Sequence, residues 1–316
     1  MSGIAEMSPR VEEARRWLET HKERTGNSLT ELGLLLDLDK SMVSKFLSGT
    51  YTGDNGKLAD KVLAYRDRLA QSERLSVSVR TNPEWYDTRT SRVMTDFLHY
   101  AQQGEIVLII TPPGVGKTKA AKKFADSYAN VWLATVSPTT SRIGPMLGVV
   151  AKAIGLGAIR GKANDISERI CEYVEGRDGL LIIDEVQEMT EKALNEVRRW
   201  NDQTGVGIAL LGNDEVLNVV DRRNPKLAQL WSRVSVTHEQ KSAHPDDIAA
   251  CLDAWGITGE AERNLLHRIG LSAGALREVT KTIKMADVMA AAAGRDITID
   301  LLESAVRRRN TRVGKW

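Results

Sequence analysis

A glycine-rich loop with a lysine and a threonine at its end spans residues 111–118, TPPGVGKT, between an apolar run and a helical pattern. The glycines of such a loop let backbone N–H groups surround phosphate groups at the start of a helix. Lys117 then reaches the β- and γ-phosphates, and the hydroxyl of Thr118 coordinates Mg²⁺. Thr111 stands where the usual pattern has glycine. We nevertheless predict a site for ATP and Mg²⁺ formed by Pro113, Gly114, Val115, Gly116, Lys117 and Thr118.

Two carboxylates end the apolar run GLLIIDE at residues 179–185. In a fold that carries a phosphate loop, Asp184 orients Mg²⁺, and Glu185 is placed to polarise the water that attacks the γ-phosphate. Two acids after a strand can also simply cap the helix that follows. Their pairing with the loop at 111–118 favours the catalytic interpretation.

Three further polar residues follow in a suggestive order. Asn213 comes after an apolar run, Arg233 lies in LWSR, and Arg277 lies in GALR. They match the sensor 1, arginine-finger and sensor 2 positions of AAA+ ATPases, in which guanidinium groups stabilise the charge that spreads over the transferred phosphoryl group. Arg233 is expected to act on the ATP of a neighbouring subunit. An ordinary ion pair within one subunit is the alternative.

The elements that must position these residues follow from the apolar runs. Runs rich in β-branched residues alternate with helical patterns and lie at 105–111, 130–135, 179–184, 205–211 and 234–237. This alternation indicates a parallel, doubly wound sheet covered on both faces. We predict an α/β P-loop NTPase core of the AAA+ type at 85–242. Because no good strand follows Pro245, the rest, 243–316, is expected to be a helical lid with a basic tail.

The N-terminal residues 1–70 predict an all-α domain that contains a helix-turn-helix. Residues 28–49 have the apolar spacing of two short helices packed across a tight turn, with Gly33 where the helices approach most closely. Asp37 stands where this turn usually has glycine, which leaves open an αα-hairpin that binds no DNA. In the helix-turn-helix interpretation, the second helix enters the major groove. Its predicted DNA contacts are Lys40, Ser41, Ser44 and Lys45.

A polar segment at 71–84, which lacks apolar periodicity and ends near Pro83, is expected to be a linker. The C-terminal residues Arg307, Arg308, Arg309, Arg312 and Lys315 come with no acid after position 306. Such a tail is either a solvated chain end or a nucleic-acid contact.

The composition restricts the class of protein. The formal net charge is only +2, so nucleic-acid contacts must come from local patches. The two cysteines, Cys171 and Cys251, form no metal-binding or disulfide pattern, which fits a reducing compartment. Apolar runs are far shorter than the ~20 residues of a membrane helix. A soluble cytoplasmic protein with no membrane partner is expected.

The order of these segments resembles the Mu B family of AAA+ ATPases, the ATP-dependent activators of target DNA in transposition. The resemblance covers nearly the whole chain and rests on the helix-turn-helix, TYTGDNGKL, PPGVGKT, LLIIDEVQEM, ALLGND, LWSRV and GALR. It implies ATP-bound subunits that form a helical filament on duplex DNA with little sequence preference and present that DNA to a DDE transposase. The transposase would stimulate hydrolysis and clear the filament. If a phage encodes the protein, its place is the host cytoplasm.

Assembly of many subunits explains how a nearly neutral chain could bind DNA, because the phosphate contacts of each subunit add along one duplex. In the family, the segment after the second strand faces DNA, which implies contacts by Arg142, Arg160 and Lys162. Ordinary surface charge is the alternative for these three. Two other functions remain open. One is a helicase-loading ATPase, and the other is a non-enzymatic, nucleotide-switched DNA-binding regulator, against which Glu185 weighs.

Overall fold

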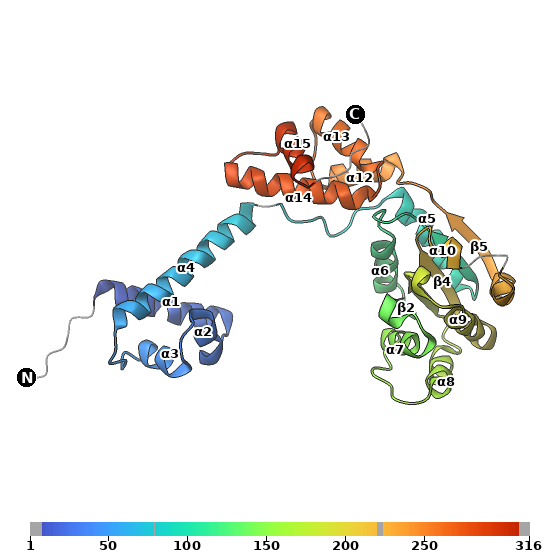
Figure 1. Cartoon of the computed structure of the whole chain (residues 1–316), viewed down its shortest axis with the longest axis horizontal. Helices are drawn as coiled ribbons and strands as arrows, with labels where there is room; N and C mark the ends of the chain where they lie inside the picture. Colours follow the sequence, from blue (N-terminus) through green and yellow to red (C-terminus); the bar gives the residue numbers. More distant parts are fainter. Residues whose placement is uncertain (1–7, 79, 220–223, 310–316) are drawn as a thin grey trace, which may run out of the picture. The chain divides into compact units, whose positions relative to one another are not determined.

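The computed structural model of the 316-residue chain describes residues 8–78, 80–219 and 224–309. The chain divides into two compact units (Figure 1). One comprises the chain up to Arg80 together with Ala291–Arg295, and the other comprises the rest from Thr81 onward. The boundary after Arg80 falls within the linker expected at 71–84.

The second unit is built on a five-stranded parallel sheet with the strand order β2-β3-β4-β1-β5. The strands are β1 (Ile106–Ile110), β2 (Val131–Thr135), β3 (Leu180–Asp184), β4 (Gly207–Gly212) and β5 (Val234–Glu239). All predicted strands are present, with slightly different ends. Parallel neighbours need crossover connections, and helices therefore alternate with the strands as predicted.

Helices cover both faces of this sheet. They are α5 (Arg89–Gln102), α6 (Lys117–Ser127), α7 (Ile143–Ala153), α8 (Ala163–Val174) and α9 (Glu191–Thr204). Side chains of β1 alternate between the faces: Ile106, Leu108 and Ile110 pack with α7, α8 and α9, whereas Val107 and Ile109 pack with α5 and α6. Because both faces are covered, all of β1 is buried, which explains its uninterrupted apolar sequence.

The C-terminal part of the second unit is helical, as predicted. Its helices are α12 (Pro245–Ala254), α13 (Glu260–Gly270), α14 (Ala275–Ala293) and α15 (Ile299–Arg308). They enclose an apolar core of their own around Ile248, Leu266, Val279 and Leu302. The short helices of the unit are η1 (Pro138–Thr140), η2 (Val186–Glu188), α10 (Val216–Val219), η3 (Pro225–Leu227) and α11 (Ala228–Trp231).

The basic tail is partly folded. Arg307 lies in the last turn of α15 and pairs with Glu303, while Arg309 bonds to Glu278 of α14 at 2.7 Å. The prediction of a free tail is therefore wrong for Arg309, because an acid far away in the sequence compensates its charge. Arg312 and Lys315 lie outside the described residues.

The first unit consists of α1 (Pro9–Thr25), α2 (Leu29–Leu36), α3 (Lys40–Leu47) and α4 (Asn55–Ser78) in the residues described. Leu18, Leu32, Phe46 and Val62 are buried at its centre. Helices α2 and α3 with their short turn occupy the two helical segments predicted at 28–49. The apolar spacing reflects this shared core.

The turn between α2 and α3 explains the unusual Asp37. Asp37 has a φ of 54°, a left-handed conformation that aspartate tolerates better than most residues. Lys61 of α4 donates a hydrogen bond to the Asp37 carbonyl oxygen at 2.7 Å and holds this turn. A Cβ on Gly33 would lie 2.6 Å from the Leu38 carbonyl oxygen, so the predicted close approach at Gly33 is confirmed.

The segment expected as a linker at 71–84 differs from the prediction. Helix α4 continues through it to Ser78. The sequence from Gln71 to Ser78 contains neither glycine nor proline, so nothing in the backbone stops the helix before Pro83. No helix in the described part of the chain is both long and apolar enough to cross a membrane.

Candidate nucleotide site

The phosphate loop joins β1 to α6, and its backbone explains its residue types. Gly114 and Gly116 have φ values of 92° and 104°, which favour glycine. Thr111 does not have a positive φ, so its side chain is compatible with a position where glycine is usual. Lys117 is the first residue of α6, so the N–H groups of the helix start face the loop opening.

A buried cluster lies at the start of α6 and the end of β3. The Asp184 carboxylate is fully buried; it accepts a hydrogen bond from the Thr118 hydroxyl at 2.6 Å and lies 3.6 Å from the Lys117 ammonium group. The Glu185 N–H donates to the same carboxylate at 3.0 Å. These bonds compensate a buried charge that would otherwise be costly.

The pair Thr118 and Asp184 fits Mg²⁺. Protein sites for Mg²⁺ in nucleotide enzymes use one or two oxygen side chains and leave the other positions to phosphate and water. Within the described residues there is no cluster of three or more His, Cys, Asp or Glu that could hold a metal ion alone. The hydroxyl and carboxylate are thus suited to an ion that arrives with a nucleotide.

Glu185 is held by a residue that the sequence did not single out. Gln187 donates a hydrogen bond from its Nε2 to the Glu185 carboxylate, and its Oε1 accepts one from the Asn213 N–H at 3.4 Å. Gln187 therefore links the acid after β3 to the end of β4. Glu185 itself has a φ of 62°, an unfavourable conformation for a non-glycine residue that is typical of functional sites. The Asn213 side-chain oxygen accepts from the Glu215 N–H at 2.9 Å.

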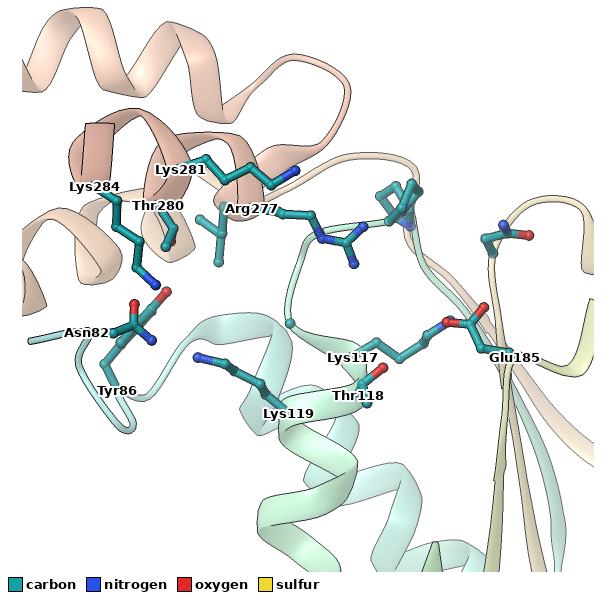
Figure 2. Close-up of a pocket in the computed structure, with 16 residues that line it drawn as sticks. Asn82, Tyr86, Lys117, Thr118, Lys119, Glu185, Arg277, Thr280, Lys281 and Lys284 are labelled. Carbon is teal, nitrogen blue, oxygen red and sulfur yellow. The ribbon is translucent and has the colours of Figure 1, made fainter. Parts of the chain in front are cut away.

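A cavity of about 460 Å³ lies between the phosphate loop and the lid, a size suited to a small-molecule ligand. Lys117 and Glu185 point toward one another at one end, and Arg277 extends from α14 over the cavity (Figure 2). Asn82, Tyr86 and Lys284 gather at the other end (Figure 2). Basic side chains predominate in the lining, which suits a polyphosphate. Its Lys, Arg and Glu residues are Lys117, Lys119, Glu185, Arg277, Lys281 and Lys284.

The lid closes directly on the phosphate loop. The Arg277 N–H donates to the Gly114 carbonyl oxygen at 3.2 Å. Val115 is 1% exposed and packs in the apolar core of the lid, so only its backbone remains for a nucleotide. The contact places the predicted sensor 2 residue beside the phosphate loop.

Burial raises the pKa of two groups beside this cavity. Desolvation raises the pKa of the Tyr86 phenol, with the neighbouring Cys251 as a further cause. Desolvation also raises the pKa of the Cys251 thiol. A tyrosine is protonated at neutral pH even without this shift, so Tyr86 presents a hydroxyl at this end of the cavity.

Arg233 does not line the cavity. Its guanidinium Nε donates to the Asp202 carboxylate at 2.7 Å, and its side chain is 55% exposed. The ion pair foreseen as the alternative is therefore formed in this structure. Action on a neighbouring subunit remains a prediction and requires this pair to open.

The predicted DNA-contacting residues are exposed. Lys40, Ser41, Ser44 and Lys45 form the outward side of α3, opposite the buried Val43 and Phe46. Arg142 directly precedes α7, Lys162 directly precedes α8, and Arg160 lies in the loop between these helices. Exposure is necessary for a DNA contact, and the assignment stays a prediction.

Comparison with known proteins places the chain in a family. A profile described as "Mu B transposition protein, C terminal" matches residues 232–308, and one described as "AAA domain" matches residues 100–220. The "Mu-like prophage FluMu DNA transposition protein B" of Haemophilus influenzae is 30% identical over 270 residues, which cover 84% of this chain and 93% of that protein. The chain belongs to the Mu B family. The "ATP-dependent target DNA activator B" of Escherichia phage Mu is 27% identical over 300 residues, covering 94% of this chain and 95% of that protein.

Solved structures support the fold. The Aeropyrum pernix ORC2 protein is similar with a TM-score of 0.56 at 20% identity, covering 72% of this chain and 68% of that one. Drosophila ORC bound to DNA gives a TM-score of 0.54 at 12% identity, covering 75% and 66%. The predicted AAA+ core with its parallel sheet is confirmed, and the Mu B family and the AAA domain together indicate an ATPase.

Several lining residues of this Mu B site were not predicted. Thr280, Lys281 and Lys284 lie on α14 at helical spacing from Arg277. Because residues three or four apart share one helix face, the sequence could have indicated them once Arg277 was assigned to the site. Asn82 and Tyr86 lie within or beside the segment assigned to the linker, where no pattern distinguishes them.

Substitution of Gly114 tests the contact between lid and loop. A Cβ at Gly114 would lie 2.0 Å from the Gly274 carbonyl oxygen, and its φ disfavours any side chain. We expect Gly114→Ala to weaken binding of a fluorescent ATP analogue by at least about tenfold, because the lid must move away. Gly148→Ala is the matched control, since nothing lies within 4 Å of its Cβ position. Equal affinities of both variants would contradict the contact.

Proposed function

We propose that this chain is an ATP-dependent activator of target DNA in transposition. It binds ATP and Mg²⁺ between the phosphate loop and the lid, binds duplex DNA with little sequence preference as a helical assembly of many copies, and delivers that DNA to a DDE transposase. The observation that carries the proposal is the complete cavity, in which Lys117, Glu185 and Arg277 converge, in a chain related to proteins named as ATP-dependent target DNA activators.

The residues of the cavity have separate tasks in hydrolysis. Lys117 and the loop N–H groups bind the β- and γ-phosphates. Thr118 and Asp184 would hold Mg²⁺, which supplies positive charge against the phosphate oxygens. Glu185 orients the attacking water and accepts its proton, and Gln187 keeps that carboxylate in place. Asn213, which follows β4, lies at the same end of the cavity, and Arg277 binds the phosphate groups of ATP from the lid side.

Assembly would connect ATP to DNA. Arg233 lies outside its own cavity, so its use as a catalytic group requires the ATP of an adjacent copy. Arg142, Arg160 and Lys162, with Lys40, Ser41, Ser44 and Lys45 of α3, supply a few phosphate contacts per copy. Many copies along one duplex add these contacts, so affinity would depend on the ATP-bound assembly. Glu185 in the cavity favours this function over a pure nucleotide switch.

Two measurements on the full chain test the proposal. We expect ATP hydrolysis to increase on addition of duplex DNA of mixed sequence. Electron microscopy with a slowly hydrolysed ATP analogue should show filaments on that DNA, whereas ADP should give none. A helicase-loading ATPase would hydrolyse ATP without coating the duplex. Absence of hydrolysis, together with isolated dimers at specific sites, would instead support the nucleotide-switched regulator.

A further inference from the structure

The end of α15 is fixed to the helix that carries Arg277. Arg309 donates hydrogen bonds from Nη2 to the Glu278 carboxylate at 2.7 Å, and from Nη1 to the Glu278 carbonyl oxygen at 3.2 Å and the Thr282 hydroxyl at 2.6 Å. The side chains of Arg309 and Glu278 are only 16% and 20% exposed. This forked contact holds both the side chain and the backbone of the first turn of α14, and its burial limits screening by salt.

Glu278 in turn packs toward the phosphate loop. A Cβ on Gly274 would lie 2.6 Å from the Glu278 Cγ, so this side chain covers the Gly274 backbone. The Gly274 carbonyl oxygen in turn lies 2.0 Å from the position that a Cβ on Gly114 would take. A continuous chain of contacts therefore runs from Arg309 through Glu278 and Gly274 to the loop that binds phosphate.

The turn held by these contacts is conformationally unfavourable. Gly274 and Ala275 have φ values of 94° and 47°. The left-handed region crowds the Cβ of alanine, so this backbone persists only where its surroundings hold it. Arg277 follows two residues later, and a relaxed turn would move its guanidinium out of the cavity.

We infer that Arg309 is a positioning residue for nucleotide binding and that it acts through Arg277. Its bonds to Glu278 and Thr282 fix the first turn of α14, so that Arg277 extends over the cavity (Figure 2). Arg309 itself does not line the cavity. The inference rests on the proposed ATP site and adds to it a residue at the far end of the lid.

A double-mutant cycle on the full chain tests this role. Affinity for a fluorescent, slowly hydrolysed ATP analogue is measured for wild type, Arg309→Met, Arg277→Ala and the double variant. We expect Arg309→Met to weaken binding about tenfold, and to have almost no further effect once Arg277 is absent. Glu278→Gln should act in the same direction as Arg309→Met. In hydrolysis assays, KM should rise more than kcat falls.

Controls separate positioning from general damage. Arg307→Met removes a neighbouring cation whose side chain is 68% exposed, and should leave affinity unchanged. Thermal unfolding by circular dichroism shows whether each variant folds. If Arg309→Met lowers the affinity for the analogue equally in the presence and in the absence of Arg277, the role of Arg309 is merely structural and the inference is overturned. If Arg309→Met and Glu278→Gln bind the analogue normally while Arg277→Ala binds it weakly, the role of Arg309 is overturned but the proposed ATP site is not. If Arg277→Ala also binds the analogue normally, the proposed ATP site is contradicted as well.

Discussion

Glu185→Gln is expected to bind ATP nearly as well as wild type and to hydrolyse it at least about 10²-fold more slowly. The amide has the shape of the carboxylate, and Gln187 can still donate a hydrogen bond to its oxygen. An amide cannot accept the proton of the attacking water, however. The buried Asp184 and its bonds to Lys117 and Thr118 remain intact, so the nucleotide should stay bound.

Steady-state phosphate release and analogue binding, both with duplex DNA present, check this prediction. Glu188→Gln is the matched control, because it makes the same chemical change in η2, the short helix that directly follows Glu185, outside the cavity lining. A Glu185→Gln variant that hydrolyses ATP at the wild-type rate would show that another group activates the water. The measured hydrolysis, and no longer Glu185, would then be the argument against a pure switch.

The AAA+ core could be predicted because its strands and motifs leave patterns within short stretches of sequence. Strands β1, β3 and β4 are buried on both faces, so their residues must be apolar throughout, and the loop and the two carboxylates follow strand ends in sequence. The carboxyl ends of parallel strands share one edge of the sheet, which brings Lys117, Asp184 and Asn213 to the same region. Motif order was therefore enough to predict which of these side chains lie together at this end of the sheet.

Other features of the structure depend on contacts between distant residues, which no local pattern encodes. Arg309 belongs to a basic run at the end of the sequence, yet it binds Glu278, which lies far away in the sequence. Arg233, in the turn between α11 and β5, has an exposed guanidinium whose partner Asp202 lies on α9. Asn82 takes part in the cavity although it belongs to a segment with the composition of a linker.

Backbone conformation explains two departures from expected motifs. Thr111 replaces the usual glycine at a position without positive φ, so the loop does not need glycine there. Asp37 does occupy a left-handed position, and Lys61 supports it from α4. The residue type alone could not distinguish a tolerated departure from a lost function, because the answer lies in the φ angle and its neighbours.

Lys117→Met is expected to abolish detectable hydrolysis and to weaken ATP binding by at least about 10²-fold, because the charge that meets the β- and γ-phosphates is lost. It should also destabilise the nucleotide-free protein. Asp184 is fully buried and would lose its cation, which costs roughly 3 to 5 kcal/mol in the free energy of unfolding. Urea denaturation without nucleotide measures this loss, and phosphate release measures the activity.

The double variant Lys117→Met with Asp184→Asn separates the two effects. The neutral amide removes the uncompensated charge and keeps one oxygen, which can accept from the Glu185 N–H. Its NH2 group then faces the Thr118 hydroxyl, which can accept a hydrogen bond instead of donating one. Most of the stability should therefore return, while hydrolysis stays undetectable, because neither the phosphate-binding cation nor the Mg²⁺ ligand is restored. If stability stays low in the double variant, the loss arises from packing around the Lys117 stem rather than from charge. If hydrolysis survives Lys117→Met, the phosphate loop cannot be the site of the chemistry.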